Sequence, residues 1–191
     1  MKKLSMEELN RISVEEFKAA QKLPLTVVLD NVRSQNNIGS VFRTSDAFRV
    51  EHIALCGICS TPPHREIHKT ALGAEESVDW SYHDETVDCV RRLKEQGYSV
   101  FAVEQVDDSV MLNQFASYWE QKSAGEEHSK IAIILGNEVE GVQETLLPLC
   151  DGCIEIPQFG TKHSLNVSCA AAIVLWELYK IFTYTYLHHD Q

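Results

Sequence analysis

Residues 154–168 read Ile154-Glu-Ile-Pro-Gln-Phe-Gly-Thr-Lys-His-Ser-Leu-Asn-Val-Ser168 and join two regular elements. The short apolar stretch 153–156 predicts a strand. Pro157 and Gly160 then predict an irregular loop, because proline lacks an N–H for a strand ladder and glycine favours turns. A strand, a loop and a following helix together indicate an α/β fold.

The helix of this unit is expected over 166–184. Ser164 or Asn166 can cap its first turn by accepting a hydrogen bond from a free backbone N–H. The small residues 170–172 allow another helix to pack closely against it. Taken alone, this pattern is equally typical of an ordinary capped core helix.

Strand-like and helix-like segments alternate along the rest of the chain. This alternation predicts a mostly parallel sheet flanked by helices. Strands are expected over 25–29, 52–56, 78–82, 98–103 and 130–135. Helices are expected over 6–20, 38–48, 85–96 and 143–147, and a short helix is expected to end at Gly73. The stretch 105–129 is expected to be irregular and acidic, with a helix over 111–119.

The length of 191 residues favours a single domain with a substantial core. We expect that domain over 24–191, preceded by a helical extension over 1–23. A capping box of Ser5 and Glu8 is expected to begin the helix of this extension, and Pro24 is expected to end it. The sequence shows no signal peptide, lipidation motif or membrane-spanning apolar run. A cytoplasmic protein without membrane association is therefore expected, with its six cysteines reduced and mostly buried.

Charge is distributed unevenly along the chain, whose formal net charge is −11. Residues 75–129 carry thirteen acidic and four basic residues, whereas residues 31–74 carry three acidic and five basic residues. The acidic total argues against a nucleic-acid partner, but the basic stretch keeps one possible. Charge alone does not separate these interpretations.

The basic stretch contains Asn31-Val-Arg-Ser-Gln-Asn-Asn-Ile-Gly-Ser-Val-Phe-Arg43. Asn37 stands where a helix N-cap is expected, and Gly39 and Arg43 are spaced to share one helix face. The missing side chain at Gly39 would let a ligand or a neighbouring backbone approach. By itself, the segment is more typical of a capping asparagine, a packing glycine and a surface arginine.

A third segment, Leu135-Gly-Asn-Glu-Val-Glu-Gly141, follows an apolar strand. Gly136 permits a tight turn near a ligand, and the charge of Glu138 is favourable near a helix start. A G-x-G-x-x-G fingerprint and a phosphate-binding P-loop are both missing from the sequence, which argues against an ordinary dinucleotide-binding fold.

Taken together and in this order, the three segments resemble the SpoU (TrmH-like) branch of the SPOUT RNA 2′-O-ribose methyltransferases. The resemblance covers about residues 24–180 and departs from the family at Gln158 and Phe159, where a methionine is common. The matching motifs are N-x-x-x-x-N-x-G-x-x-x-R at Asn37, Gly39 and Arg43, G-x-E-x-x-G at Gly136, Glu138 and Gly141, and I-P-M-x-G with S-L-N-V-S at Ile156, Pro157, Gly160 and 164–168.

The resemblance implies a C-terminal trefoil knot, a homodimer packed partly through the final helix, and S-adenosylmethionine as the cofactor. It also implies two groups of site residues. Catalytic roles fall to Arg43, Asn37, Glu138, Ser164 and Asn166, and cofactor binding to Leu135, Gly136, Asn137, Gly141, Ile156, Pro157, Gln158, Leu165 and Asn166.

The implied reaction transfers a methyl group to a ribose 2′-hydroxyl of RNA, with tRNA favoured over ribosomal RNA by analogy. A ribose hydroxyl is a poor nucleophile, so the protein must orient it and weaken its O–H bond. Arg43 against a neighbouring phosphate can do both, with a phosphate oxygen sharing the role of base. Because the chain is acidic, RNA binding is expected to need dimerisation or a partner subunit.

Two alternatives stay open. Cys56, Cys59, His64 and His68 have the spacing of a compact zinc site, although buried thiols are the more ordinary interpretation. A non-catalytic knotted protein that binds RNA is the second alternative, and the intact polar motif residues argue against it.

Overall fold

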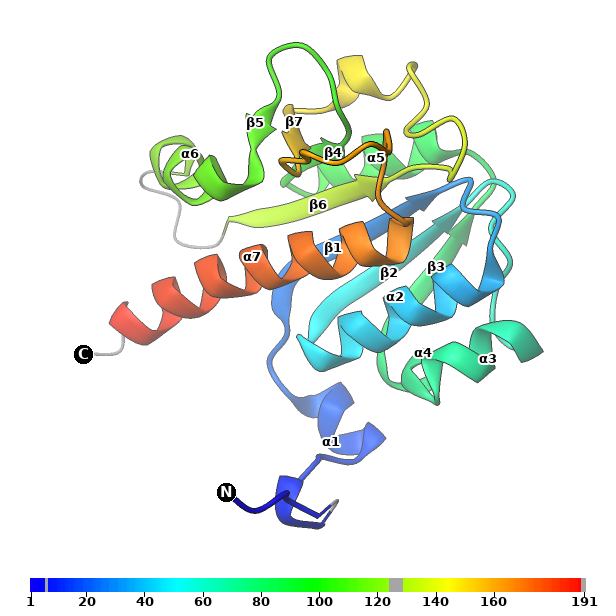
Figure 1. Ribbon diagram of the computed structural model, residues 1–191, viewed down its shortest axis with the longest axis vertical. Coiled ribbons are helices and arrows are strands. Elements are labelled where there is room, and N and C mark those ends of the chain that lie inside the picture. Colours follow the sequence, from blue (N-terminus) through cyan, green and yellow to red (C-terminus); the bar gives the residue numbers. More distant parts are fainter. Residues whose placement is uncertain (6, 124–128, 190–191) are drawn as a thin grey trace.

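The computed structural model describes residues 1–5, 7–123 and 129–189, with only the backbone for 7 and 184–189 (Figure 1). Its centre is a seven-stranded sheet in the order β3-β2-β1-β6-β4-β7-β5. Every neighbouring pair in this sheet is parallel, which confirms the predicted fold class. The strands are β1 (Leu23–Asp30), β2 (Val50–Cys56), β3 (Asp79–His83), β4 (Tyr98–Val103), β5 (Val110–Met111), β6 (Lys130–Leu135) and β7 (Gly152–Glu155).

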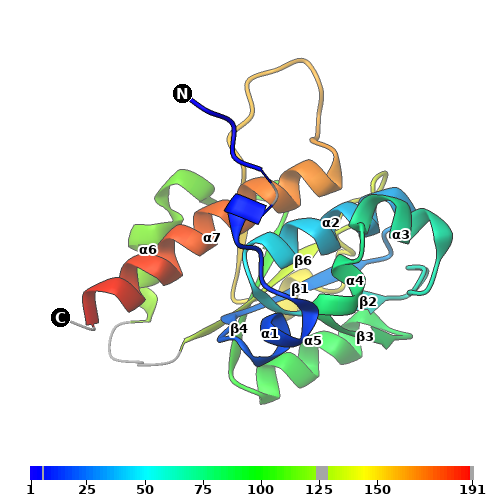
Figure 2. The same ribbon diagram turned by 90° about the horizontal axis from the view of Figure 1, so that it is seen from below.

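Helices cover both faces of the sheet (Figure 2). The first face carries α2, α3, α4 and α7, and α5 lies on the other face. Among the described residues, no helix combines the length and apolar character needed to cross a membrane. The helices are α1 (Val14–Ala19), α2 (Gln35–Ala47), α3 (Arg65–Ala71), α4 (Ala74–Ser77), α5 (Thr86–Glu95), α6 (Phe115–Lys122) and α7 (Val167–His189), with short 3₁₀ turns η1 (Glu7–Leu9), η2 (Leu112–Gln114) and η3 (Leu147–Leu149).

The strand sequences explain why the sheet needs both layers. Successive side chains of a strand point to opposite faces, so a strand covered on both sides is apolar throughout. In β1, Val27 and Leu29 pack into the cluster beneath α2 and α7, whereas Val28 packs into the cluster beneath α5. β6 divides in the same way, with Ile133 in the first cluster and Ile134 in the second.

The N-terminal extension is not the single helix expected over 6–20, whose first residue, Met6, lies outside the described residues. Ser5 and Glu8 do form the two reciprocal hydrogen bonds of a capping box, but they begin only the 3₁₀ turn η1. Asn10 then adopts a left-handed conformation with φ 45°, and a second capping box at Ser13 starts α1. The prediction that Pro24 ends the helix is also wrong, because Pro24 lies within β1.

One further expectation in the C-terminal half is wrong. Residues 144–146 form a turn that leads into η3 rather than a helix, and Gln143 bonds to Asp30 of β1 through both its backbone N–H (3.0 Å) and its side chain (2.6 Å). The helix expected over 111–119 is confirmed, since η2 and α6 together cover 112–122, and the remainder of the stretch 105–129 contains β5, which pairs with β7 at the edge of the sheet. Residues 124–128 of that stretch lie outside the described residues.

Candidate active site

Three segments that are far apart in the sequence meet beyond the carboxyl end of β6. The side-chain amide of Asn37 donates to Oε1 of Glu138 at 3.0 Å. The side-chain amide of Asn166 donates in turn to Oδ1 of Asn37 at 3.2 Å. These three residues were predicted from three separate motifs, and the structure brings them into one hydrogen-bonded row.

The carboxylate of Glu138 lies at the N-terminus of α2. It accepts hydrogen bonds from the backbone N–H groups of Arg33 and Ser34, both at 3.1 Å. Partial burial opposes ionisation of Glu138, but the hydrogen bonds from Asn37, Arg33 and Ser34 outweigh it and lower its pKa below the usual value. The helix dipole adds a favourable field for this charge.

These contacts correct two details of the sequence-based interpretation. Ser34, not Asn37, is the N-cap of α2, and its hydroxyl accepts from the N–H of Asn37. Glu138 does not stand at the start of a helix in its own segment. Its carboxylate instead accepts hydrogen bonds at the start of α2, which lies more than a hundred positions earlier in the chain.

Asn166 caps α7, and it is one of the two residues, Ser164 and Asn166, that were predicted as the cap. Its Oδ1 accepts from the backbone N–H groups of Ser168 (2.9 Å) and Cys169 (3.4 Å). The cap uses the oxygen of the amide, which leaves the nitrogen free to donate to Asn37. Ser164 does not cap the helix and lies in the wall of a cavity instead.

This cavity of about 280 Å³ opens between the turn after β6 and the loop after β7. Seven of the nine residues predicted to bind the cofactor line it, and Pro157 and Asn166 do not. Apolar side chains from strand ends and α7 supply part of the wall, and polar groups supply the rest. The lining comprises Val103, Glu104, Gln105, Leu135, Gly136, Asn137, Glu138, Val139, Glu140, Gly141, Ile154, Glu155, Ile156, Gln158, His163, Ser164, Leu165, Val167 and Ala170.

The turn 136–141 is closed by a pair of backbone hydrogen bonds between Asn137 and Gly141, each 2.9 Å long. A Cβ atom on Gly136 would lie 2.1 Å from the carbonyl carbon of Gly141, so the two sides of the turn leave no space for a side chain. Gly141 has φ 73°, in the left-handed region that glycine adopts without strain. The glycines of the motif therefore shape one wall of the cavity.

The sequence-based interpretation missed three polar residues of this region. Glu104 and Gln105 follow β4 and both line the cavity. Fully buried Asp30, at the end of β1, accepts hydrogen bonds from Thr86 (2.6 Å) and Gln143, and so ties the turn after β6 to the sheet. Their position at strand ends was a usable signal, but none belongs to a recognised motif.

Arg43 is placed differently from the other predicted catalytic residues. It is exposed on α2 and makes no hydrogen bond or ion pair with any residue that the structure describes. It follows Asn37 by six positions, which corresponds to about 9 Å along a helix axis. The structure therefore does not bring the guanidinium of Arg43 into the Glu138–Asn37–Asn166 row. Gly39, one turn before it, allows the backbone of α3 at Ile67 to approach α2 closely.

The residues of the alternative zinc site have other partners. Cys59 is buried, its thiol contacts the carbonyl oxygen of Leu29, and burial raises its pKa to about 11. His64 caps α3, and His68 lies 2.6 Å from Glu75. Among the described residues, no group of three or more His, Cys, Asp or Glu side chains is placed to hold a metal ion.

A fully parallel sheet with a cavity beyond the carboxyl ends of its strands is typical of α/β proteins that bind a small ligand there. The sequence profile of the SpoU rRNA Methylase family matches residues 24–176. The chain belongs to this family, as the three motifs predicted.

Curated relatives act on two kinds of RNA. The tRNA (guanosine(18)-2′-O)-methyltransferase of Thermus thermophilus is 33% identical over 172 residues, which cover 89% of this chain and 81% of the relative. The 23S rRNA (guanosine-2′-O-)-methyltransferase RlmB of Vibrio parahaemolyticus is 31% identical over 170 residues, and the match spans only 64% of that protein.

Solved structures agree with the fold. The TrmH/SpoU tRNA modifying enzyme of A. aeolicus has a TM-score of 0.74 at 24% identity, with 90% of this chain and 81% of that chain covered. An AdoMet-bound rRNA methyltransferase from Sinorhizobium meliloti has a TM-score of 0.71 at 25% identity, with 86% of this chain and 59% of that chain covered.

Proposed function

We propose that the protein transfers a methyl group from S-adenosylmethionine to a ribose 2′-hydroxyl of RNA, and that the RNA is a tRNA. The row of Glu138, Asn37 and Asn166 beside the cavity carries this proposal. The relative that methylates tRNA favours tRNA, because the match covers 81% of that protein but only 64% of RlmB. Ribosomal RNA is the second candidate because of the RlmB relative.

The cavity suits S-adenosylmethionine in its chemistry. Leu135, Ile156 and Leu165 offer apolar surface for an adenine ring, and the backbone of the turn 136–141 offers hydrogen-bonding groups at close range. Pro157 and Asn166, although outside the lining, hold the two ends of the loop that forms the opposite wall. When bound, the cofactor supplies a methyl group on a positively charged sulfur.

The residues of the chain orient the hydroxyl that receives this methyl group. Since Arg43 lies about 9 Å along α2 from Asn37, we place the substrate nucleotide between the guanidinium and the cavity. Arg43 then binds the phosphate next to the reacting sugar, and a phosphate oxygen accepts the hydroxyl proton. Asn37 and Ser164 position the ribose, and Glu138 holds Asn37 in the required orientation.

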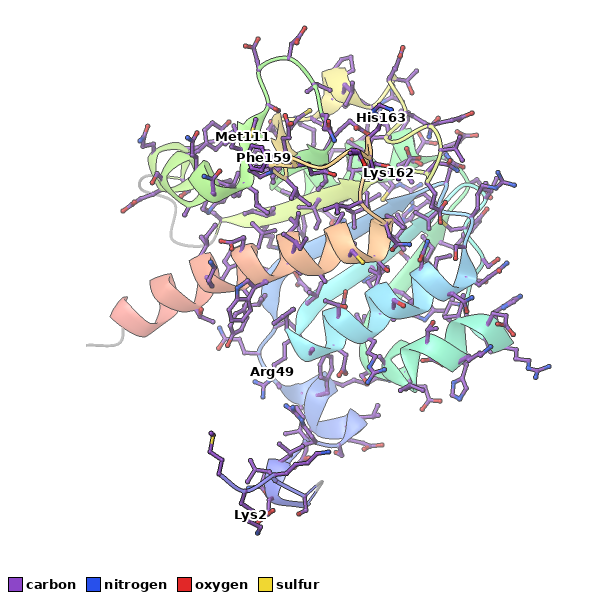
Figure 3. The ribbon with its side chains drawn as sticks, in the orientation of Figure 1. Lys2, Arg49, Met111, Phe159, Lys162 and His163 are labelled. Carbon is purple, nitrogen blue, oxygen red and sulfur yellow. The ribbon has the colours of Figure 1, made fainter. Side chains whose placement is uncertain are left out.

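The loop 157–165, which separates β7 from α7, supplies a surface for RNA. Phe159 is 98% exposed, and the neighbouring Lys162 and His163 are exposed as well (Figure 3). The loop contains no acidic residue. An exposed aromatic ring offers a surface on which a base stacks, and a cation of the same loop can pair with a phosphate.

We also propose that two copies of the chain form a homodimer through α7 and that the segment before α7 is threaded as a trefoil knot. Cys169, Ile173 and Trp176 are exposed and follow each other at helical spacing, so they form one apolar stripe on α7. A second copy that covers this stripe would place two RNA-binding loops on one assembly. A partner subunit is the alternative way to complete the RNA-binding surface.

The proposal is tested by incubating the protein with labelled S-adenosylmethionine and total RNA, followed by alkaline digestion. A 2′-O-methyl group blocks cleavage of the adjacent phosphodiester, so label is expected in an alkali-resistant dinucleotide from the tRNA fraction. Label in ribosomal RNA would support the second candidate, and label in alkali-sensitive mononucleotides would refute ribose methylation.

The matched variants for this assay are Arg43→Ala and Arg91→Ala. Arg43→Ala is expected to lower methyl transfer at least about 100-fold with donor affinity nearly unchanged, because the guanidinium contacts the nucleotide and not the cofactor. Arg91 lies on α5, on the opposite face of the sheet, and Arg91→Ala should leave both quantities unchanged. Normal turnover in Arg43→Ala would remove Arg43 from the mechanism.

A further inference from the structure

The carboxylate of Glu104 is fixed in the wall of the cavity. Its Oε2 accepts from the backbone N–H of Val142 at 3.0 Å, and its Oε1 accepts from the N–H of Gln105 at 2.9 Å. A Cβ atom on Gly141 would lie 2.2 Å from Oε2, so the glycine leaves the space that this carboxylate fills. The two bonds hold the charge in place, because the side chain cannot turn away without breaking both.

The charge of Glu104 is not neutralised by a cation. No ion pair joins it to any residue in the described part of the chain, and neither lysine nor arginine is part of the cavity lining. Glu138 differs, because three N–H groups and the dipole of α2 already compensate its carboxylate. Glu155 resembles Glu104, since its bond comes from the neutral hydroxyl of Ser109 at 2.6 Å.

A fixed negative charge distinguishes two forms of the ligand that are otherwise nearly identical. S-adenosylmethionine carries a sulfonium, and the product left after methyl transfer, S-adenosylhomocysteine, carries a neutral thioether. Coulomb attraction falls only as the reciprocal of distance, so a carboxylate in the cavity wall acts on the sulfonium without touching it. Hydrogen bonding and apolar packing act on both forms alike.

We propose that Glu104 is a specificity-determining residue that makes the cavity prefer the cationic methyl donor over its neutral product. The proposal rests on the proposed function, since it concerns the same cavity. It implies that the donor binds more tightly than its shape alone would allow, while the affinity for the product is set by shape and hydrogen bonding. Release of the product then frees the cavity for the next donor.

The test is the affinity of the purified protein for both ligands, measured by calorimetry on the wild type and on Glu104→Gln. Glutamine has nearly the same shape and keeps one acceptor oxygen, but it removes the charge. The ratio of the two dissociation constants, product over donor, is expected to fall about fivefold in Glu104→Gln. This change should come from weaker donor binding, with product affinity nearly unchanged.

Glu95→Gln is the matched control, because Glu95 is an exposed glutamate at the end of α5 and outside the cavity. It should leave the ratio unchanged. Equal weakening of both ligands by Glu104→Gln would show a purely structural role for Glu104 and overturn the proposal. Failure of the wild type to bind either ligand would instead overturn the proposed function.

A salt titration of the wild type tests the charge preference of the whole cavity if Glu104→Gln does not fold, because Glu138, Glu140 and Glu155 also line it. Rising ionic strength screens charge, so the preference for the donor should decrease between low and high sodium chloride. A ratio that stays constant with salt would contradict the proposal.

Discussion

The turn 136–141 and the loop 157–165 form opposite walls of one cavity, yet they are built in different ways. The turn is bonded to its surroundings on several sides: Asn137 donates to the carbonyl of Asn31 at 2.8 Å, and Glu138 binds the start of α2. Within the described part of the chain, the loop is joined to the body by one hydrogen bond, from the side chain of Gln105 to the carbonyl of His163 at 2.9 Å. Figure 2 shows the loop extending away from the body.

This difference separates two tasks. A group that must orient reacting atoms gains from a wall whose position is set by many contacts. A surface that must meet a large partner needs exposed side chains, which the loop provides from Phe159 to Asn166. We therefore expect substitutions in the turn to affect folding and the cofactor, and substitutions of exposed loop residues outside the cavity lining, such as Phe159, to affect the RNA.

The largest expected effect is that of a methyl group added to the turn. Gly136→Ala places a Cβ atom against backbone of the same turn and should lower the free energy of unfolding by about 3 kcal/mol. Gly160→Ala in the loop is the matched control, because no atom lies within 4 Å of the added Cβ, and it should change stability by less than about 0.5 kcal/mol. Urea unfolding of both variants measures the comparison. Equal losses would show that the two walls do not differ in packing.

An intermediate effect, dependent on pH, is expected for Glu138→Gln. The pKa of Glu138 is lower in the folded protein than its ordinary value of about 4.3, so its ionised form stabilises the fold above that value. At pH 7 the variant should be less stable than the wild type by about 1 kcal/mol, allowing for solvent screening. The difference should shrink as pH falls below about 4.5 through the folded pKa. Urea unfolding at several pH values provides the measurement, and a constant difference would contradict the assigned contacts.

The smallest effect on stability is expected for Phe159→Ala, since the ring is almost fully exposed. Unfolding should change by less than about 0.5 kcal/mol, whereas the KM for RNA should rise about tenfold through loss of base stacking. Donor affinity should stay the same, because the lining includes the neighbouring Gln158 but not Phe159. If the variant instead shifts the protein from dimer to monomer in ultracentrifugation, Phe159 contacts a second copy rather than RNA.

Much of the fold follows from local patterns. Runs such as 131–135 predict strands covered on both faces, because no half-exposed strand would be apolar at every position. In the N-terminal region, local patterns did not predict the observed structure. Helical periodicity over 6–20 predicts one helix, but the left-handed Asn10 and the second capping box at Ser13 divide it.

The candidate site was predictable as a set of residues and not as an arrangement. Asn37, Glu138 and Asn166 are visible in the sequence through their motifs, but their hydrogen bonds span more than a hundred positions. Glu104 and Asp30 belong to no motif, and their importance appears only when the ends of β4 and β1 are placed beside the turn.

The sequence by itself determined the parallel α/β class, the family and the main polar residues of the site, because each depends on short-range periodicity or on motif spacing. Only the tertiary structure decided which atoms meet. The carboxylate of Glu138 accepts a hydrogen bond at the start of α2. The side-chain oxygen of Asn166 caps α7 and its nitrogen donates to Asn37, whereas Arg43 is exposed and makes no such contact with the described residues. The physical reason is that hydrogen bonds between distant segments depend on strand order and crossing, which local propensities do not encode.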